Sequence, residues 1–245
     1  MREGVLSLPS ITIGDTVINY EIIRSNRKTM GIIVDPDEGV IVRSPQNVSE
    51  DKIKEVVKKK SSWLLQKLDK VDEIKPAPTP LEFMSGEKLP YLGRRYRLQV
   101  EEYDKKKVEV KFYQGKFIVK EPADMEDRRE AIRDKVIGWY RERANEKIKE
   151  RVDKYKDKIG IEPNNVKVKK QKKRWGSCSG KDNLNINWKL IMAPMSIVDY
   201  IVVHELTHLE HSNHSQDFWQ TAEAVIPDYE EKQEWLRVNG RKLDL

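Results

Sequence analysis

Short apolar runs alternate with polar residues at the start of the chain, and this alternation predicts strands. The runs are residues 16–23, 30–34 and 40–42. Turn-forming residues, Asp35–Gly39, separate the last two runs. An apolar stripe with helical spacing then extends from Ile53 to Leu68, and Ser49 is its expected N-cap. Residues 1–75 are therefore predicted to form a β-rich unit that ends in a helix.

A similar pattern follows the proline-rich stretch Lys75–Pro80, which predicts an extended linker. The strand-like runs are now residues 96–100, 108–112 and 117–119, and a helical pattern from Ile132 to Ile148 follows them. Trp63 and Trp139 occupy matching places in the two helical patterns. We interpret residues 76–160 as a second unit and the pair as a duplicated three-strand-plus-helix unit, with a repeat of about 77 residues. A chance resemblance of two β-then-α stretches is the alternative.

The last third of the chain changes character. Residues 166–169 and 184–188 alternate like strands, and Lys170–Ser179 lies between them. Pro194 and Ser196 open a helix whose apolar residues continue to Leu209. Two closing helices are predicted at residues 217–225 and 229–238. Residues 161–245 are thus expected to form a third unit, and the whole chain is predicted to be an α+β protein.

Charge is unevenly distributed along the 245 residues, although the formal net charge is only +6. Ten acidic and four basic residues lie from Ser196 onward, which leaves 43 basic and 31 acidic residues before it. A basic surface can attract nucleotides or nucleic acid. The alternative is a solvated lysine-rich surface, which the interleaved glutamates favour.

One cysteine, Cys178, excludes an intrachain disulfide and favours a reducing compartment. The first residues lead into no apolar segment of the signal-peptide kind, and no run reaches the length of a membrane span. We therefore expect a cytoplasmic protein with no membrane partner. The sequence predicts no particular oligomeric state.

All four histidines of the chain lie between His204 and His214. His204, Glu205 and His208 form an H-E-x-x-H pattern, in which residues four apart share one face of a helix and can bind one zinc ion. Glu205 projects about 100° around the helix from His204, so it would lie beside the metal. There it could act as a general base toward water.

A zinc site of this kind needs a third protein ligand. His211 would stand about 10.5 Å from His204 along a straight helix, which is too far to share an ion. His214 follows Ser212 and Asn213, residue types that favour helix ends and turns, so the chain can fold back there. The predicted ligands are therefore His204, His208 and His214, with His211 nearby as a candidate for contact with the site or the substrate.

The segment Arg174–Cys178 allows two interpretations. It could be a strand edge beside the metal, where an extended substrate would pair through its main chain. It could equally be an ordinary hairpin whose lysines discourage edge pairing. Cys178 could be a metal ligand, but three histidines already complete a catalytic set. Arg174, Tyr200 and His211 are candidates for stabilising a developing negative charge.

Several segments together resemble the YgjP-like metallopeptidase family. They are Lys173–Cys178, Asn185–Leu190, Pro194, Asp199–Leu209, Asn213–Ser215 and Phe218–Trp219 in the last third, with Arg24–Arg27, Trp63, Ser85–Glu87 and Tyr91–Tyr96 in the first half. That family is described as zincin-like metal-dependent hydrolases, distantly similar to the SprT-like proteases. The resemblance implies a zincin-like α+β core in the last hundred residues, with the zinc ligands His204, His208 and His214 and with Glu205 as the catalytic carboxylate.

The histidine spacing is also similar to that of the metzincin proteases. Here, however, His211 stands where those enzymes have glycine, and no methionine follows Met195. A metzincin methionine turn is therefore absent, which favours the YgjP-like family.

Three functional hypotheses follow. The first is a zinc-dependent hydrolase that cleaves peptide bonds in peptide or protein substrates. The second keeps the site but gives it a phosphate ester or anhydride such as a nucleotide, because the basic run Lys169–Arg174 precedes the hairpin. The third is a nucleic-acid-binding or protein-binding module with a non-catalytic metal, motivated by the basic N-terminal portion.

Overall fold

The computed structural model describes residues 8–245, which divide into two compact units at residues 75 and 76. The division falls in a stretch of the chain without helix or strand that includes the proline-rich segment. Each unit has its own hydrophobic core and is described by itself.

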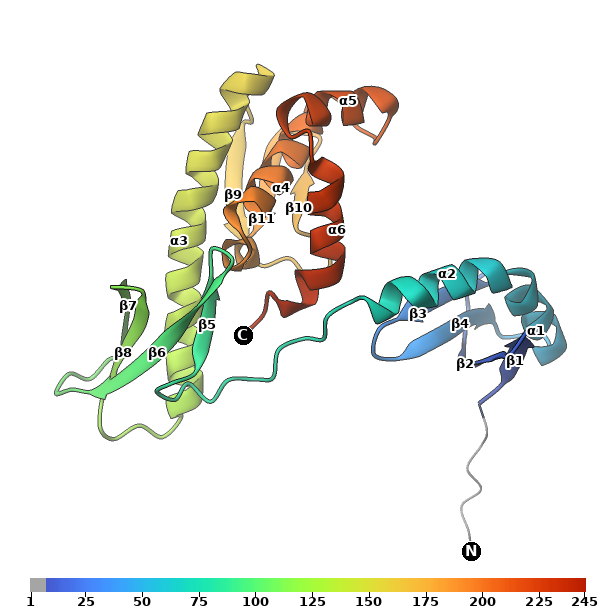
Figure 1. Ribbon diagram of the computed structural model, residues 1–245, viewed down its shortest axis with the longest axis horizontal. Helices are drawn as coiled ribbons and strands as arrows, with labels where there is room; N and C mark the ends of the chain where they lie inside the picture. Colours follow the sequence, from blue (N-terminus) through green and yellow to red (C-terminus); the bar gives the residue numbers. More distant parts are fainter. Residues whose placement is uncertain (1–7) are drawn as a thin grey trace, which may run out of the picture. The chain divides into compact units, whose positions relative to one another are not determined.

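The first unit is a four-stranded sheet with two helices (Figure 1). Its strands are β1 (Ser10–Ile13), β2 (Thr16–Ser25), β3 (Gly31–Asp35) and β4 (Gly39–Pro45), and its helices are α1 (Glu50–Lys59) and α2 (Ser61–Asp72). The strand order is β1-β2-β4-β3, in which β2 and β4 are parallel and the other pairs are antiparallel. Ile53 and Val57 of α1 and Leu64 of α2 are fully buried in the core of this unit.

The helical region of this unit begins as the sequence predicts and then departs from it. The Ser49 hydroxyl accepts a hydrogen bond from the Lys52 backbone N–H and caps α1. The prediction of one continuous helix is wrong, because the helical conformation is interrupted at Lys60, which has φ −99° and ψ 13°. Its N–H bonds to two carbonyls of the last turn of α1, and a new helix starts at Ser61.

The second unit begins with a sheet of the same design. Its strands are β5 (Lys88–Tyr91), β6 (Arg94–Glu102), β7 (Glu109–Tyr113) and β8 (Lys116–Glu121). The order β5-β6-β8-β7 and the pattern of one parallel and two antiparallel pairs repeat those of the first sheet. The prediction of three strands in each unit is wrong, since each sheet has a fourth, four-residue strand at its edge. The internal duplication stays a proposal, which this shared topology supports.

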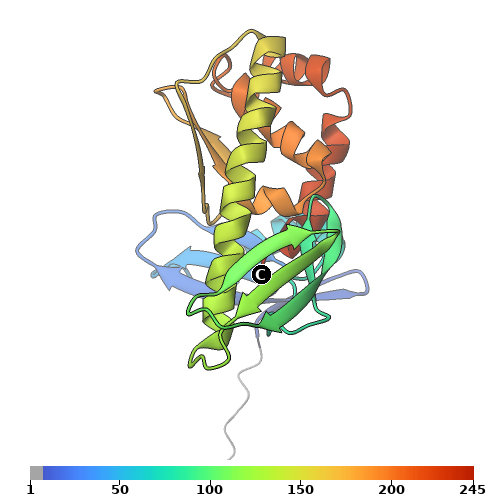
Figure 2. The same cartoon turned by 90° about the vertical axis from the view of Figure 1, so that its left-hand side faces the viewer.

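A 32-residue helix, α3 (Arg128–Ile159), runs the length of the second unit (Figures 1 and 2). The β5–β8 sheet lies along its N-terminal half. The remaining elements lie along its C-terminal half: β9 (Asn165–Lys169), β10 (Gly176–Cys178), β11 (Asn183–Asn187), α4 (Met195–Thr207), α5 (Gln216–Val225), α6 (Tyr229–Asn239), and the short 3-10 helices η1 (Trp188–Met192) and η2 (Gly240–Lys242). The three strands form a sheet in the order β10-β11-β9, with β9 and β11 parallel.

The buried side of α3 joins both halves of this unit. Its buried residues recur every three or four positions: Ile132, Val136, Tyr140, Ala144, Ile148, Val152 and Tyr155. They belong to one core that also includes residues of β6, β8, β11, η1 and α4. The sequence predicts a boundary between residues 160 and 161, whereas residues 76–245 fold as one compact unit, because α3 packs against elements from both sides of that boundary.

Helix α4 occupies the interior of this unit. Nine of its thirteen residues are buried, as expected for a helix that is covered on most sides. The half-buried Asp199 of α4 accepts hydrogen bonds from Arg151 of α3, with an Nη2–Oδ2 distance of 2.7 Å. This bidentate ion pair fixes α4 against α3. The predicted α+β fold is confirmed, and among residues 8–245 no helix is both long and apolar enough to cross a membrane.

Candidate metal centre

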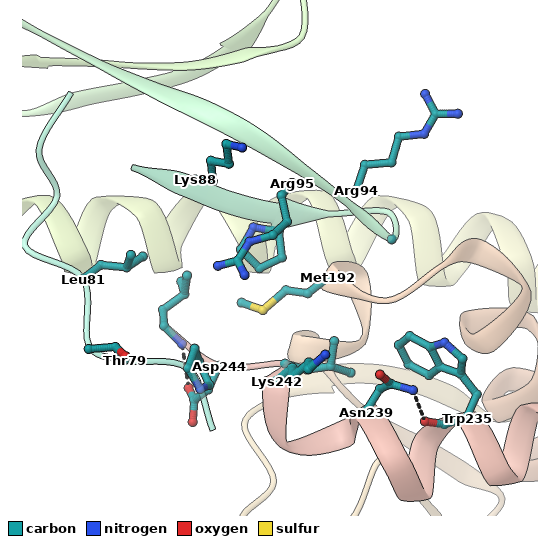
Figure 3. A pocket seen from close by; sticks show the side chains of 15 residues that line it. Thr79, Leu81, Lys88, Arg94, Arg95, Met192, Trp235, Asn239, Lys242 and Asp244 are labelled. Atoms are coloured by element: carbon teal, nitrogen blue, oxygen red, sulfur yellow. Dashed lines mark hydrogen bonds between the residues drawn. The ribbon is translucent and has the colours of Figure 1, made fainter. Parts of the chain in front are cut away.

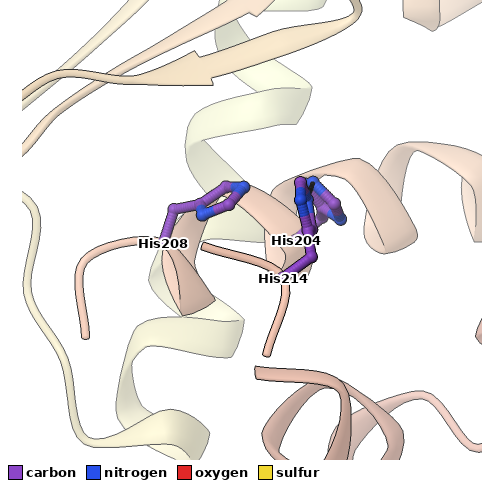
Figure 4. Close-up of side chains that lie close together, drawn as sticks. All are labelled: His204, His208 and His214. Carbon is purple, nitrogen blue, oxygen red and sulfur yellow. Dashed lines mark hydrogen bonds between the residues drawn. The ribbon is translucent and has the colours of Figure 1, made fainter. Parts of the chain in front are cut away.

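Three histidines meet at the C-terminal end of α4 (Figure 4). His204 lies in the last turn of the helix, His208 follows its final residue, and His214 returns to the same place just before α5. Their ring centroids lie 4.7–4.9 Å apart, and one ligand nitrogen from each ring lies within 4.8 Å of the others. The structure therefore brings together the three predicted ligands.

The nitrogens that face one another are suited to bind a metal ion. The Nε2 atoms of His204 and His214 lie 3.1 Å apart, close to the ~3.3 Å between ligands of a tetrahedral zinc ion. His208 donates from Nδ1 to the His211 carbonyl over 3.0 Å, which leaves its Nε2 free to coordinate. Burial lowers the pKa of His204 to about 3, and burial also lowers that of His214. Both rings are therefore neutral at neutral pH, as metal coordination requires.

Two adjacent aromatic residues of α5, Phe218 and Trp219, pack against this cluster. Phe218 is fully buried, and its ring centroid lies 5.0, 4.6 and 4.7 Å from those of His204, His208 and His214 respectively. Trp219 stacks on His214 with ring centroids 5.4 Å apart. The three histidine side chains thus pack around one phenylalanine, which restricts the orientations of all three rings.

Glu205 lies beside the histidines and is almost fully buried, with 5% of its surface exposed. Its carboxylate accepts a hydrogen bond from the Cys178 backbone N–H of β10. Burial raises the pKa of Glu205 to about 7, against the opposing effects of the Arg174 charge and of this hydrogen bond. A buried carboxyl group thus stands next to the three clustered histidines and does not belong to the group that could hold a metal ion.

A cavity of about 630 Å³ opens onto His204, Glu205, His208 and His214. Arg174 and residues 176–180, which include β10, also line this cavity. Because β10 is at the end of the sheet order, one of its edges carries no strand among residues 8–245. The cavity therefore combines three clustered histidines, a buried carboxyl group and a strand at the edge of its sheet.

The other predicted site residues take different positions. Arg174 lines the cavity, and its charge acts on Glu205. Tyr200 is buried within α4, and its ring centroid lies 5.8 Å from that of His204. Burial raises the pKa of Tyr200 to about 12.

The ring of His211 lies near Thr221, with Nε2 3.3 Å from the threonine hydroxyl. The helix ends at Thr207, so His211 does not continue the α4 face as the sequence suggests. Cys178 lines the cavity with a thiol whose pKa is raised by burial.

A second cavity in this unit, of about 240 Å³, lies between the β5–β6 hairpin and the end of α6 (Figure 3). Arg95 points into it above Met192, and Lys242 lies on its other side. Its lining contains neither histidine nor glutamate among the described residues. This cavity therefore lacks the chemistry of the histidine site.

A buried helix that ends in an H-E-x-x-H sequence, followed by a third histidine that returns to the same place, fits the metallopeptidase class that the sequence resembles. Comparison with known families agrees with this class. The family model described as "YgjP-like, metallopeptidase domain" matches residues 28–239. The chain belongs to the YgjP-like metallopeptidase family.

Two solved structures are similar to part of the chain. The metallopeptidase zymogen abylysin of Pyrococcus abyssi is 26% identical, with a TM-score of 0.34, over 38% of this chain and 93% of that one. The zymogen jannalysin of Methanocaldococcus jannaschii is 25% identical, with a TM-score of 0.32, over 35% of this chain and 92% of that one. No curated protein matches the chain.

Gly176, Phe218 and Trp219 belong to segments that carry the family resemblance, but their role in the site was not predicted from the sequence. A glycine within a strand indicates close approach of another group, and this signal was present at Gly176. The adjacent aromatic residues Phe218 and Trp219 gave a weaker signal. Their contacts with the histidines depend on the position of α5, which the sequence does not predict.

Proposed function

We propose that this protein is a zinc-dependent metallopeptidase whose site is formed by His204, His208, His214 and Glu205. The observation that carries the proposal is the convergence of three imidazole nitrogens beside a buried carboxyl group, in a cavity bordered by an open strand edge. Membership in a metallopeptidase family supports it.

Zinc is the metal that this ligand set favours. Three imidazoles with no carboxylate or thiolate among them match the three-protein-ligand arrangement of catalytic zinc sites, which leaves a position for water. When bound, zinc lowers the pKa of a coordinated water and polarises a carbonyl oxygen.

Glu205 would move the protons of the reaction. Its carboxylate would accept a proton from the attacking water as the carbon–oxygen bond forms. It would then deliver that proton to the amide nitrogen as the carbon–nitrogen bond breaks. The burial of Glu205 beside the ligands suits this role, because a water at the site would lie within reach of both.

Strand β10 is the proposed binding edge for an extended peptide. Residues 176–178 line the cavity, and a peptide could pair as an additional strand with those main-chain groups that are not bonded to Glu205. Of the three candidates for stabilising negative charge, Arg174 is the one that lines the cavity. We therefore assign it to the developing oxyanion of the substrate.

The test is a side-by-side assay of zinc-loaded wild type and Glu205→Gln on casein-like peptides and on nucleoside triphosphates. The glutamine variant keeps the size of the side chain but cannot accept a proton. We expect peptide cleavage by the wild type, a loss of at least about 100-fold in the variant, and equal zinc content in both.

Two other outcomes would overturn the proposal. Phosphate release that depends on Glu205, without peptide cleavage, would indicate a phosphohydrolase. Purified protein that contains no zinc and takes up none would remove the basis of either enzyme and favour a binding module. Steeply salt-dependent binding to DNA or RNA would support that last interpretation.

A further inference from the structure

We propose that Gly176 is a positioning residue: the absence of a side chain there creates the space in which the Glu205 carboxyl group lies against β10. The catalytic part of this inference rests on the function proposed above, whereas the packing part stands on the geometry alone.

The space is too small for any other residue. A Cβ atom built on Gly176 would lie 2.4 Å from Oε1, 2.5 Å from Cγ and 2.7 Å from Cδ of Glu205. Real Cβ atoms essentially never approach other heavy atoms to less than 3.0 Å. All three nearest atoms belong to the same side chain, so an alanine at this position would act on Glu205 before anything else.

Glu205 has little freedom to move away from such a contact. It lies on α4, which is buried on most sides, and only 5% of its own surface is exposed. Its carboxylate is also held by the Cys178 backbone N–H, two residues along the same strand. A side chain at position 176 would therefore have to break this hydrogen bond or shift the helix end that carries His204.

The backbone does not explain the glycine. The glycines with left-handed φ values are Gly14, Gly39, Gly86, Gly93, Gly115 and Gly160, and Gly176 is not among them. Its conformation is open to alanine, and a glycine inside a strand weakens the strand. Close contact with Glu205 is thus the physical reason for a glycine here.

The arrangement couples the proposed base to the proposed binding edge. Gly176 and Cys178 both lie against Glu205, Gly176 through the space that its missing side chain leaves and Cys178 through its backbone N–H. The carboxyl group is therefore positioned by the same strand along which the peptide would lie. A displacement of about 1 Å at a reacting group can lower a rate by about 100-fold.

Thermal unfolding of the metal-free protein tests the packing without any assay of activity. The variants are Gly176→Ala, Glu205→Ala and the double variant. Gly176→Ala should lower the Tm of the wild type by at least about 3 °C through overpacking. In the Glu205→Ala background all three clashing atoms are gone, so the same change should leave the Tm unchanged or raise it.

Gly138→Ala is the matched control, because Gly138 lies in α3 and a Cβ there would meet nothing within 4 Å. It should shift the Tm equally in both backgrounds. Gly176→Ala that fails to fold alone but folds with Glu205→Ala would support the proposal. An equal loss of Tm in both backgrounds, or a double variant that also fails to fold, would overturn it.

Kinetics then test the catalytic consequence. Gly176→Ala should lower kcat on a peptide by about 100-fold, with KM and the zinc dissociation constant changed less than about threefold. A kcat within twofold of the wild type would overturn the positioning role. Absence of any peptidase activity in the wild type would instead count against the proposed function, while the unfolding experiment would still decide the packing.

Discussion

The two four-stranded sheets of this protein have the same strand order and the same pairing, yet only one belongs to the unit with the candidate site. After β4 the chain forms two short helices, α1 and α2, and the unit closes around a small core. After β8 it forms the 32-residue α3, which extends beyond its sheet. The part of α3 beyond the sheet packs against β9, α4 and α5, and the proposed ligands lie in α4 and in the loop between α4 and α5.

The difference indicates that the two similar sheets do not themselves determine whether a unit contains the site. The length of the helix after each sheet determines whether further strands and helices can pack there. In the first unit, the break at Lys60 ends α1 after ten residues. In the second, the apolar stripe of α3 continues past the sheet and provides a surface on which α4 can be buried. Four predictions test this contrast, from the largest expected effect to the smallest.

The first prediction concerns the loop after α4, which has no counterpart in the first unit. His214→Ala should weaken zinc binding by more than about 100-fold, because one of three ligands is lost. His211→Ala should change it by less than about tenfold, since His211 contributes its backbone carbonyl to His208. Competition with a chromogenic chelator measures both. Equal losses would contradict the ligand assignment.

The second prediction compares one buried residue from each unit. Phe218→Ala should cost about 3–5 kcal/mol of stability and also weaken zinc binding, because the three ligand rings pack on Phe218. Leu64→Ala should cost about 2–5 kcal/mol but leave zinc affinity unchanged, since Leu64 belongs to the core of the first unit. Denaturant unfolding and chelator competition are the measurements. A zinc defect in the Leu64 variant would show that the units are coupled.

The third prediction concerns the ion pair between α3 and α4. Asp199→Ala or Arg151→Ala should each lower the free energy of unfolding of the second unit by about 1.5–3 kcal/mol. The free energy of unfolding of the double variant should fall by much less than the sum of the two single losses, because the second substitution removes a side chain whose partner is already gone. Additive losses in a double-mutant cycle would indicate that the two side chains act separately.

The fourth prediction is that removal of residues 1–75 has the smallest effect on the site. Residues 76–245 have their own core and contain all the proposed site residues. The shortened protein should bind zinc with an affinity within about threefold of that of the full chain, as calorimetry would measure. Loss of binding would mean that the first unit supports the site directly.

The sequence predicted α5 and α6 closely, because apolar spacing and turn residues mark them clearly, whereas the predicted pattern from Ile132 to Ile148 covers only the middle of α3. The strands β1 and β5 were not predicted, since four-residue edge strands show little alternation of apolar and polar residues. Pro90 within β5 also argues against a strand in a sequence-based prediction. The convergence of His204, His208 and His214 was predictable from helical spacing and from the turn before His214. The positions of Phe218 and Gly176 relative to Glu205 and the histidines were not, because they depend on packing between segments distant in the sequence.

The measurement that tests the central claim most directly is a crystal structure of the zinc-loaded protein with anomalous diffraction recorded at the zinc absorption edge. A single anomalous peak bounded by the ring nitrogens of His204, His208 and His214, with the Glu205 carboxyl group beside it and not coordinated, is the expected result. A peak elsewhere, coordination by His211 in place of His214, or no peak after zinc loading would contradict the assignment of this site.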